Sequence, residues 1–272
     1  MGSPRSRCGS GAGKIAAVPL VSVILPVYNR EALVGRAIES VLAQSYRPLE
    51  LIVVDDGSTD GTRAVLERYK GEITILEQPR GGAYVARNLA LRHARGELVA
   101  FIDSDDVWLP HRLASQVPLM QNPDVGLVFG DALHVPGRRR TCFQVSPPRR
   151  GRAAARFAWC NFVPTITVLA RKSCIEEAGG FSEESTLACD YLLWFRIALR
   201  HELDFVDGIV AEYTVNPDGI SYNLSRSLAA RIRLFSAELR RTTNRETRTV
   251  LKLLLLNLRL RFVLAVARGR FA

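Results

Sequence analysis

The stretch LVAFIDSDD, residues 98–106, is an apolar run that ends in a cluster of three aspartates. Two earlier runs have the same form, VILPVYN at 23–29 and LIVVDDGS at 51–58. Continuous apolar and β-branched runs of this length predict strands that are buried on both faces, as in parallel sheets. Ligands of such sheets bind outside the carboxyl ends of the strands, where two acidic clusters can hold a divalent cation and a phosphorylated ligand. The pattern therefore indicates nucleotide chemistry.

Segments with helical periodicity alternate with these strands. Apolar residues recur at helical spacing over 33–42, and Pro48 ends that segment. Further helices are predicted over 61–70 and from Gly81 to Ala94, with a short strand at 73–76 between them. Short links between alternating elements predict an α/β fold with a doubly wound, mostly parallel, Rossmann-like sheet. Later strands are expected at 125–129, 132–135 and 203–213.

Length and composition indicate a cytoplasmic globular protein. At 272 residues and 47% hydrophobic, the chain can bury a full core. No basic-then-apolar leader opens the chain, so the catalytic part is expected to stay in the cytoplasm. The five cysteines form no CxxC pair, and an odd, scattered set fits reduced thiols without a chemical role.

The net charge of +10 comes from the end of the chain. Residues 226–272 carry twelve Lys or Arg and two Glu, while residues 1–225 balance at 25 basic and 25 acidic groups. A basic, leucine-rich tail suits an anionic membrane surface better than nucleic acid. No nucleic-acid partner is expected, because no recognised binding module or interleaved aromatic pattern accompanies the charge.

The apolar part of this tail, 250–267, is not a convincing membrane span. Lys252, Arg259 and Arg261 would each cost about 2.5–3.5 kcal/mol at a bilayer centre, whereas each Leu or Val gains only about 0.3–0.6 kcal/mol. Docking at a membrane surface or packing against the α/β domain is the expected use. The chain is thus divided into a disordered leading segment (1–18), a catalytic α/β domain (19–225) and a helical tail (226–272), with a peripheral position at the cytosolic membrane face as the alternative to a purely cytoplasmic one.

Several motifs, in order, resemble those of a known family. VILPVYN (23–29), DDGSTDGT (55–62) and DSDD (103–106) resemble the first strand, the second-strand signature and the metal-binding DxD of the inverting family-two glycosyltransferases of the GT-A fold. GGAYVARN (81–88) resembles a further segment of that family. The resemblance covers roughly residues 20–222. It implies transfer of a sugar from a UDP- or dTDP-sugar donor to a hydroxyl of a saccharide or lipid-linked acceptor.

The resemblance also implies which residues bind the nucleotide. One carboxylate of Asp55 and Asp56 is expected to accept a hydrogen bond from the base N–H, which suits uracil or thymine. Capping of the following helix by Asp55 is the structural alternative. Arg87, close to a helix N-terminus, is expected to grip phosphate. The nucleotide-binding set is Pro26, Tyr28, Asp55, Asp56, Arg87 and Asp103.

A metal is implied because the departing diphosphate needs its charge neutralised, usually by Mg²⁺ or Mn²⁺. The resemblance assigns Asp105 to direct coordination and Asp103 to the ribose and metal shell, with Asp106 either behind the metal ligands or in contact with the sugar. The alternative for this cluster is a turn that ends a strand. A third ligand is expected from Asn216, which stands where many relatives have His.

The acceptor hydroxyl must lose its proton as it attacks, and a carboxylate is a suitable base. The segment CDYLLWFR (189–196) resembles the family's Glu-Asp-x-Asp-Leu-Trp-x-Arg helix and places Asp190 on the catalytic aspartate. Cys189 and Leu192 depart from this pattern, at the positions of Glu and Asp. The departures leave the base in place but are expected to alter contacts with the acceptor.

Two alternatives accompany this interpretation, and one segment is left open. A sugar nucleotidyltransferase would carry a Gly-rich loop after the first strand, which PVYNR at 26–30 does not supply. A non-catalytic GT-A-like module acting through its basic tail is argued against by the retained Asp103, Asp105 and Asp190. Residues 136–156 carry seven arginines and no acid, which fits either a solvated loop or a cationic, acceptor-facing loop.

Overall fold

The computed structural model describes residues 18–136, 150–215 and 224–267. Most of the leading segment, most of the arginine-rich segment and Asn216 therefore lie outside the described residues. Within the described ranges the strands are β1 (Val21–Val27), β2 (Leu49–Asp55), β3 (Thr74–Glu77), β4 (Leu98–Phe101), β5 (Val107–Trp108), β6 (Val125–Val135), β7 (Leu169–Arg171) and β8 (Glu202–Thr214).

Helices separate and follow these strands. The α-helices are α1 (Val34–Leu42), α2 (Thr62–Glu67), α3 (Ala83–His93), α4 (Arg112–Gln116), α5 (Lys172–Glu177), α6 (Cys189–Ala198), α7 (Leu224–Arg241) and α8 (Arg245–Ala267). Three short 3₁₀ helices are η1 (Val117–Gln121), η2 (Ala154–Ala158) and η3 (Thr165–Thr167).

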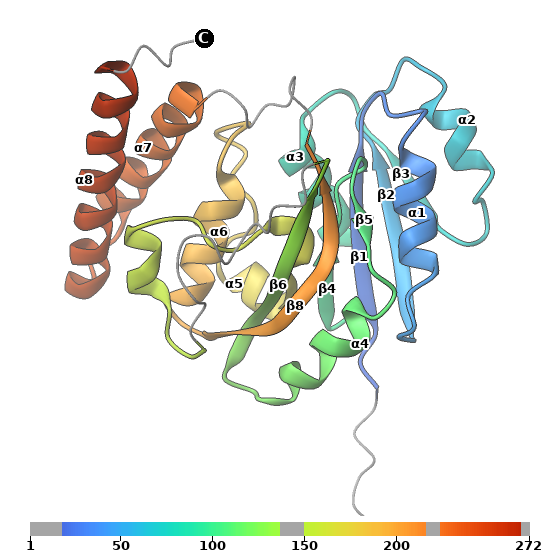
Figure 1. Cartoon of the computed structure of the whole chain (residues 1–272), viewed down its shortest axis with the longest axis horizontal. Coiled ribbons are helices and arrows are strands. Elements are labelled where there is room, and N and C mark those ends of the chain that lie inside the picture. The colour runs from blue at the N-terminus through green and yellow to red at the C-terminus, as the bar shows by residue number, and fades with distance from the viewer. Residues whose placement is uncertain (1–17, 137–149, 216–223, 268–272) are drawn as a thin grey trace, which may run out of the picture.

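The strands form one mixed sheet in the order β3-β2-β1-β4-β7-β6-β8-β5 (Figure 1). Four of its seven strand pairs are parallel, including β3-β2, β2-β1 and β1-β4. The other three pairs, β4-β7, β7-β6 and β8-β5, are antiparallel. The prediction of an α/β fold with a mostly parallel sheet is therefore confirmed.

The apolar runs that predicted the fold form its centre. Every residue of β1 and β4 is buried, as are the last five of β2. Side chains of β1 alternate between two cores: Val23 and Leu25 pack with α1, and Ile24 packs with α3 on the opposite face. Helices on both faces explain why these strands read as unbroken apolar runs.

One element differs from its prediction. The sequence predicts two strands, at 125–129 and 132–135, whereas β6 is a single strand of 11 residues. The register against β8 shifts on both sides of Asp131 because β8 has extra residues there, and β6 continues through Gly130 and Asp131 without a break. Gly130 also lies so close to Val210 that a Cβ atom there would come within 2.6 Å of its side chain. Gly130 and Asp131 interrupt the apolar pattern of this segment. Sequence periodicity therefore predicts the end of a strand where the structure has a continuous one.

The two C-terminal helices pack side by side at the end of the molecule opposite to α1 and α2 (Figure 1). α7 places Phe235 against Tyr191 and Phe195 of α6. Leu251, Leu254 and Leu258 of α8 are buried in the same core cluster as Trp194. Among the described residues, no helix has the length and apolar character that crossing a membrane requires.

Candidate active site

The carboxyl ends of three adjacent parallel strands bring the predicted donor residues to one edge of the sheet. β1 lies between β2 and β4, and Val27 pairs in register with Asp55. Tyr28 follows β1, Asp55 ends β2, and Asp103 follows β4 after one residue. Residues that are far apart in sequence therefore lie at the same edge of the sheet, where such sheets bind their ligands.

Asp56 is the best-connected carboxylate of this edge. Its side chain is 2% exposed and accepts hydrogen bonds from the backbone N–H groups of Gly81 (2.7 Å) and Gly82 (2.9 Å). It also accepts one from the amide of Gln78 (2.7 Å) and forms an ion pair with Arg80. Asp56 therefore fixes the loop that leads into α3.

Tyr28 is covered by the same loop, because the Arg80 guanidinium lies 3.5 Å from the centre of its ring. Asp55 uses one oxygen, Oδ1, to accept a hydrogen bond from the Ser58 N–H (2.9 Å). The first turn of α2 is capped by Asp60, which accepts from the Thr62 N–H (3.0 Å). Asp55 thus stabilises the turn after β2 and does not cap the helix itself.

Arg87 and Asp103 form a buried ion pair. Arg87 lies on α3, is 5% exposed, and donates through Nη2 to Asp103 Oδ1. Burial by itself would lower the pKa of Arg87, but the charges of Asp103 and Asp190 and the hydrogen bond to Asp103 raise it overall. Its Nε has no hydrogen-bond partner in the described part of the chain although it is buried. A fixed cation with an unused donor therefore lies at the edge where phosphate is expected.

The pKa values of Asp105 and Asp106 are both raised by burial and by the negative charge of neighbouring aspartates. Burial and the charge of Asp103 raise the pKa of Asp105, although Arg30, 3.8 Å from it, acts in the other direction. Burial and the neighbouring charges raise the pKa of Asp106 to about 9. Asp106 accepts a hydrogen bond from the Thr214 N–H (2.7 Å), and its second oxygen is buried without a partner among the described residues.

Asp103 and Asp105 could provide two of the ligands of a divalent cation. A cation beside Asp103 and Asp105 would relieve their mutual repulsion, and carboxylate oxygens suit Mg²⁺ and Mn²⁺. Over the described residues, no group of three or more His, Cys, Asp or Glu side chains is arranged to hold a metal ion. The described residues would thus supply only part of the coordination shell of such a cation.

Asp190 lies in the first turn of α6, and both its oxygens are held by hydroxyl groups. Tyr84 donates to Oδ1 (3.1 Å) and Thr165 donates to Oδ2 (2.9 Å). Burial and the charge of Asp190 raise the pKa of Tyr84 well above its usual value, so its hydroxyl stays protonated. The carboxylate is thereby fixed in orientation between α3 and η3.

One turn of α3 connects this carboxylate to the donor edge. Tyr84 and Arg87 are three residues apart and lie on the same face of the helix. Tyr84 contacts Asp190, and Arg87 contacts Asp103. The structure therefore brings together Asp190, Arg87 and Asp103, which are separated by up to 103 residues in sequence.

The two departures from the family helix lie in the core. Cys189 is fully buried and its thiol donates to the Ser185 carbonyl (3.1 Å). Leu192 is also buried, and so is Trp194. Apolar or weakly polar side chains at these positions therefore pack inside the domain and supply no carboxylate.

Cys189 is expected to resist alkylation in the folded protein. Burial, with the nearby charge of Asp190, raises the pKa of its thiol to about 12. At pH 8 only about one thiol in 10⁴ is then a thiolate, the reactive form. Mass spectrometry after iodoacetamide treatment should find Cys189 unmodified in native protein and modified in urea. Rapid labelling of the native protein would contradict the burial described here.

Sequence reasoning missed several residues that complete the site. Tyr84 could have been found from its position one helical turn before Arg87. Arg80 and Gln78 precede the glycine pair, but nothing in their spacing shows that they fold back onto Asp56. Thr165 comes from a 3₁₀ turn with no recognisable motif.

Solved structures share this fold. S. aureus TarS superposes with a TM-score of 0.69 at 22% identity, over 89% of this chain and 72% of that one. A mannosyltransferase from Pyrobaculum calidifontis, in complex with GDP-Man and Mn²⁺, gives a TM-score of 0.65 at 23% identity, over 93% and 76%. At these identities the likeness establishes the fold.

Sequence relatives are closer. The chain is 30% identical over 213 residues to WfgD of Escherichia coli, a UDP-Glc:alpha-D-GlcNAc-diphosphoundecaprenol beta-1,3-glucosyltransferase, covering 77% of this chain and 82% of that one. It is 31% identical over 215 residues to WfaP of the same species, which has the same described activity and the same coverage. Residues 22–177 match the model of glycosyl transferase family 2. The chain belongs to glycosyl transferase family 2.

Proposed function

We propose that the protein transfers a sugar from a UDP- or dTDP-sugar to a hydroxyl of a lipid-linked saccharide, with inversion at the anomeric carbon. The observation that carries the proposal is the link through α3, which holds Asp190 by Tyr84 and Asp103 by Arg87. Asp190, the proposed base for the acceptor, and Arg87, the proposed cation for the donor diphosphate, are therefore connected by one turn of α3.

Asp190 acts as the base in a single displacement. It accepts the proton of the acceptor hydroxyl while that oxygen attacks the anomeric carbon, and the bond from this carbon to the diphosphate breaks. Tyr84 and Thr165 keep both carboxylate oxygens in place. Inversion follows because the attacking oxygen and the leaving diphosphate occupy opposite faces of the sugar.

The leaving nucleoside diphosphate is stabilised by charge. Arg87 contributes a guanidinium that Asp103 already orients. Asp103 and Asp105 would hold Mg²⁺ or Mn²⁺, which neutralises diphosphate charge when bound. Pro26, Tyr28, Asp55 and Asp56 form the edge that receives the nucleoside. Since Asp56 already accepts four hydrogen bonds, a base N–H would have to bind Asp55 or displace Arg80, whose side chain is 50% exposed.

Two relatives support the proposed donor and acceptor classes. WfgD and WfaP are described as using UDP-Glc and an acceptor in which GlcNAc is linked to diphosphoundecaprenol. Both match this chain along most of their length, which supports a UDP-sugar donor and a lipid-linked acceptor here.

A transfer assay tests the proposal. The full chain is incubated with UDP-glucose, Mn²⁺ and a GlcNAc-diphospho-lipid with a short alkyl chain, alongside a panel of other UDP- and dTDP-sugars. Coupling constants from NMR of the product report the anomeric configuration. An inverted glycoside supports the proposal, whereas retention, or no transfer from any donor while the protein remains folded, would refute it.

The exposed face of α8 supports a further part of the proposal, peripheral docking on an anionic membrane. Five large apolar side chains share this face, opposite to the face packed on the domain: Leu253, Leu256, Leu260, Val263 and Leu264. Exposed cations flank the stripe, Lys252 and Arg259 on one side and Arg261 on the other. An apolar stripe between cations complements a surface of acyl chains and anionic headgroups.

Trp159 extends the same surface. It is 70% exposed, and its carbonyl accepts a hydrogen bond from Asn257 of α8 (2.9 Å). An exposed Trp beside an apolar helix face is typical of the membrane interface. The packing of α8 and its interfacial use are thus compatible, because they involve opposite faces of the helix.

Replacing Leu256 and Leu260 together by Glu is expected to weaken binding to phosphatidylglycerol vesicles at least tenfold. The double variant puts two charges into the apolar stripe without touching the packed face. Vesicle co-sedimentation measures the change. Ala32→Glu with Ala64→Glu, at exposed positions near α1 and in α2, adds the same charge at the other end of the molecule and should have little effect. Equal losses in both double variants would mean that net charge alone governs binding.

A further inference from the structure

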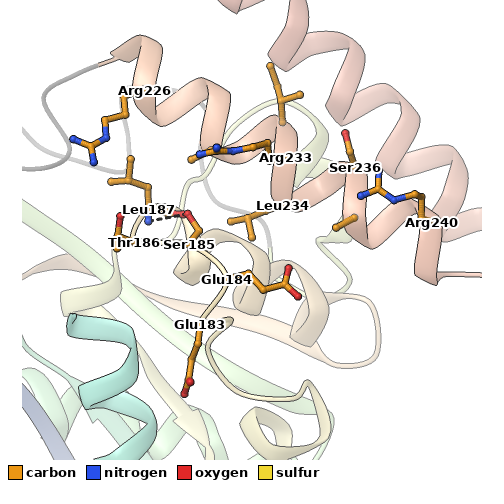
Figure 2. A pocket seen from close by; sticks show the side chains of 13 residues that line it. Glu183, Glu184, Ser185, Thr186, Leu187, Arg226, Arg233, Leu234, Ser236 and Arg240 are labelled. Carbon is orange, nitrogen blue, oxygen red and sulfur yellow. Dashed lines mark hydrogen bonds between the residues drawn. The ribbon is translucent and has the colours of Figure 1, made fainter. Parts of the chain in front are cut away.

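A cavity of about 690 Å³ lies outside the donor edge, between α7 and the segment 183–187 that leads into α6. Figure 2 shows Arg233 and Arg240 on the helix above the loop that carries Glu184 and Ser185. The two arginines are seven residues apart, so they lie on one face of α7, two turns or about 10 Å apart along its axis. A cationic stripe therefore forms one wall of the cavity.

The two acidic side chains of this cavity have partners, whereas two of its arginines have none among the described residues. Glu184 forms an ion pair with Arg241 (2.7 Å), and Glu183 accepts a hydrogen bond from the Asn88 amide (2.8 Å). Arg233 and Arg240 have no hydrogen bond or ion pair with any residue that the structure describes, and both are exposed. The acidic groups are thus occupied while two guanidinium groups remain available to an anion.

The opposite wall is joined to the helix of the candidate base. Leu187 lines the cavity, and Asp190 follows it after two residues. The thiol of Cys189 donates to the Ser185 carbonyl, which ties the wall to the start of α6. A group bound in the cavity would therefore contact the segment that leads into the helix of Asp190, without contacting the donor edge.

We propose that this cavity holds the diphosphate of a lipid-linked sugar acceptor, with Arg233 and Arg240 as its ligands. The inference rests on the proposed function, which requires an acceptor that presents a sugar hydroxyl to Asp190. In a sugar-diphospho-lipid the diphosphate lies on the far side of the sugar from the reacting hydroxyl. A cationic cavity between α7 and the segment that leads into the helix of the base matches that order of groups. The lipid then extends toward the exposed face of α8.

Binding of geranyl diphosphate to the full chain tests this site. Saturating UDP is included, so that the probe does not enter the nucleotide site, and calorimetry gives the dissociation constant. The double variant Arg233→Ala/Arg240→Ala is expected to raise this constant at least about tenfold, because two charge-assisted contacts are lost. The matched control Arg36→Ala/Arg68→Ala removes the same charge at exposed positions of α1 and the end of α2. It should change the constant less than twofold.

Several results would overturn the inference: no binding of geranyl diphosphate, equal weakening in both double variants, or equally tight binding of short-chain phosphatidylglycerol, which would indicate a general contact with anionic lipid. In turnover, the Arg233→Ala/Arg240→Ala variant should raise KM for the diphosphate acceptor and leave kcat and KM for a neutral glycoside of the same sugar unchanged. An arginine-dependent diphosphate site in a protein without transferase activity would leave the inference standing and refute the proposed function. If transfer to the lipid-linked acceptor is unchanged when both arginines are replaced, the proposed function stands and the inference is refuted.

Discussion

Replacement of Asp190 by Asn is expected to lower kcat about 10³-fold, within the range of about 10² to 10⁴ that a positioned base contributes. Asn keeps the shape of the side chain and can still accept hydrogen bonds, but it cannot take the acceptor proton. Tyr84 and Thr165 still hold the position, so the fold and the donor edge should be unchanged. The affinity for the UDP-sugar should therefore stay within about twofold of wild type.

Initial rates with the lipid-linked acceptor and calorimetry with UDP separate these two effects. Thr165→Val is the matched control, because it removes one of the two hydroxyl donors and leaves the carboxylate. We expect it to lower kcat by about tenfold or less. Full activity of Asp190→Asn would show that another group is the base. Loss of UDP affinity in that variant would place Asp190 in the donor site.

The central strands could be predicted because their sequences are apolar at consecutive positions. A strand covered by helices on both faces must be apolar at every position, and 98–102 satisfies that condition without reference to the rest of the chain. The antiparallel pairs with β7 could not be predicted, since Leu169–Arg171 is only three residues long and has no period of its own. Its place in the sheet depends on the partners β4 and β6.

In the candidate site, too, some residues could be predicted from the sequence and others could not. Asp103, Asp105 and Asp190 could be predicted as candidates because the chain resembles a family at those motifs. The contacts that organise them come from residues with no such signal, as the Thr165 hydroxyl and the Arg80 guanidinium illustrate. Long-range polar contacts of this kind depend on the orientation of loops and are not encoded in local spacing.

The tail shows a limit of helical-wheel reasoning. Leucines surround much of 250–267, so the sequence alone gives neither a clean span nor a one-sided amphipathic helix. Packing separates them: Leu251, Leu254 and Leu258 are buried, while Leu253, Leu256 and Leu260 are exposed. Only the tertiary contact with α7 and η2 tells which leucines are core and which are surface.

Replacement of Asp56 by Ala is expected to lower the free energy of unfolding by about 3–5 kcal/mol and to abolish detectable UDP binding. Removal of one member of a buried, charged network leaves the other members unpaired, and this is the main cost. Here two backbone N–H groups, at Gly81 and Gly82, and the Gln78 amide would lose their acceptor. The loop would then no longer hold Arg80 over Tyr28.

Urea denaturation measures the stability change, and calorimetry with UDP measures binding in the fraction that remains folded. Arg80→Ala is the matched comparison, because it removes only one of the four donors and its side chain is 50% exposed. We expect it to cost less than about 1 kcal/mol of stability. A small effect of Asp56→Ala on both measurements would mean that the loop is held by other contacts. A loss of UDP binding without a loss of stability would instead assign Asp56 to the nucleotide alone, since a carboxylate that organises the loop cannot be removed without weakening the fold.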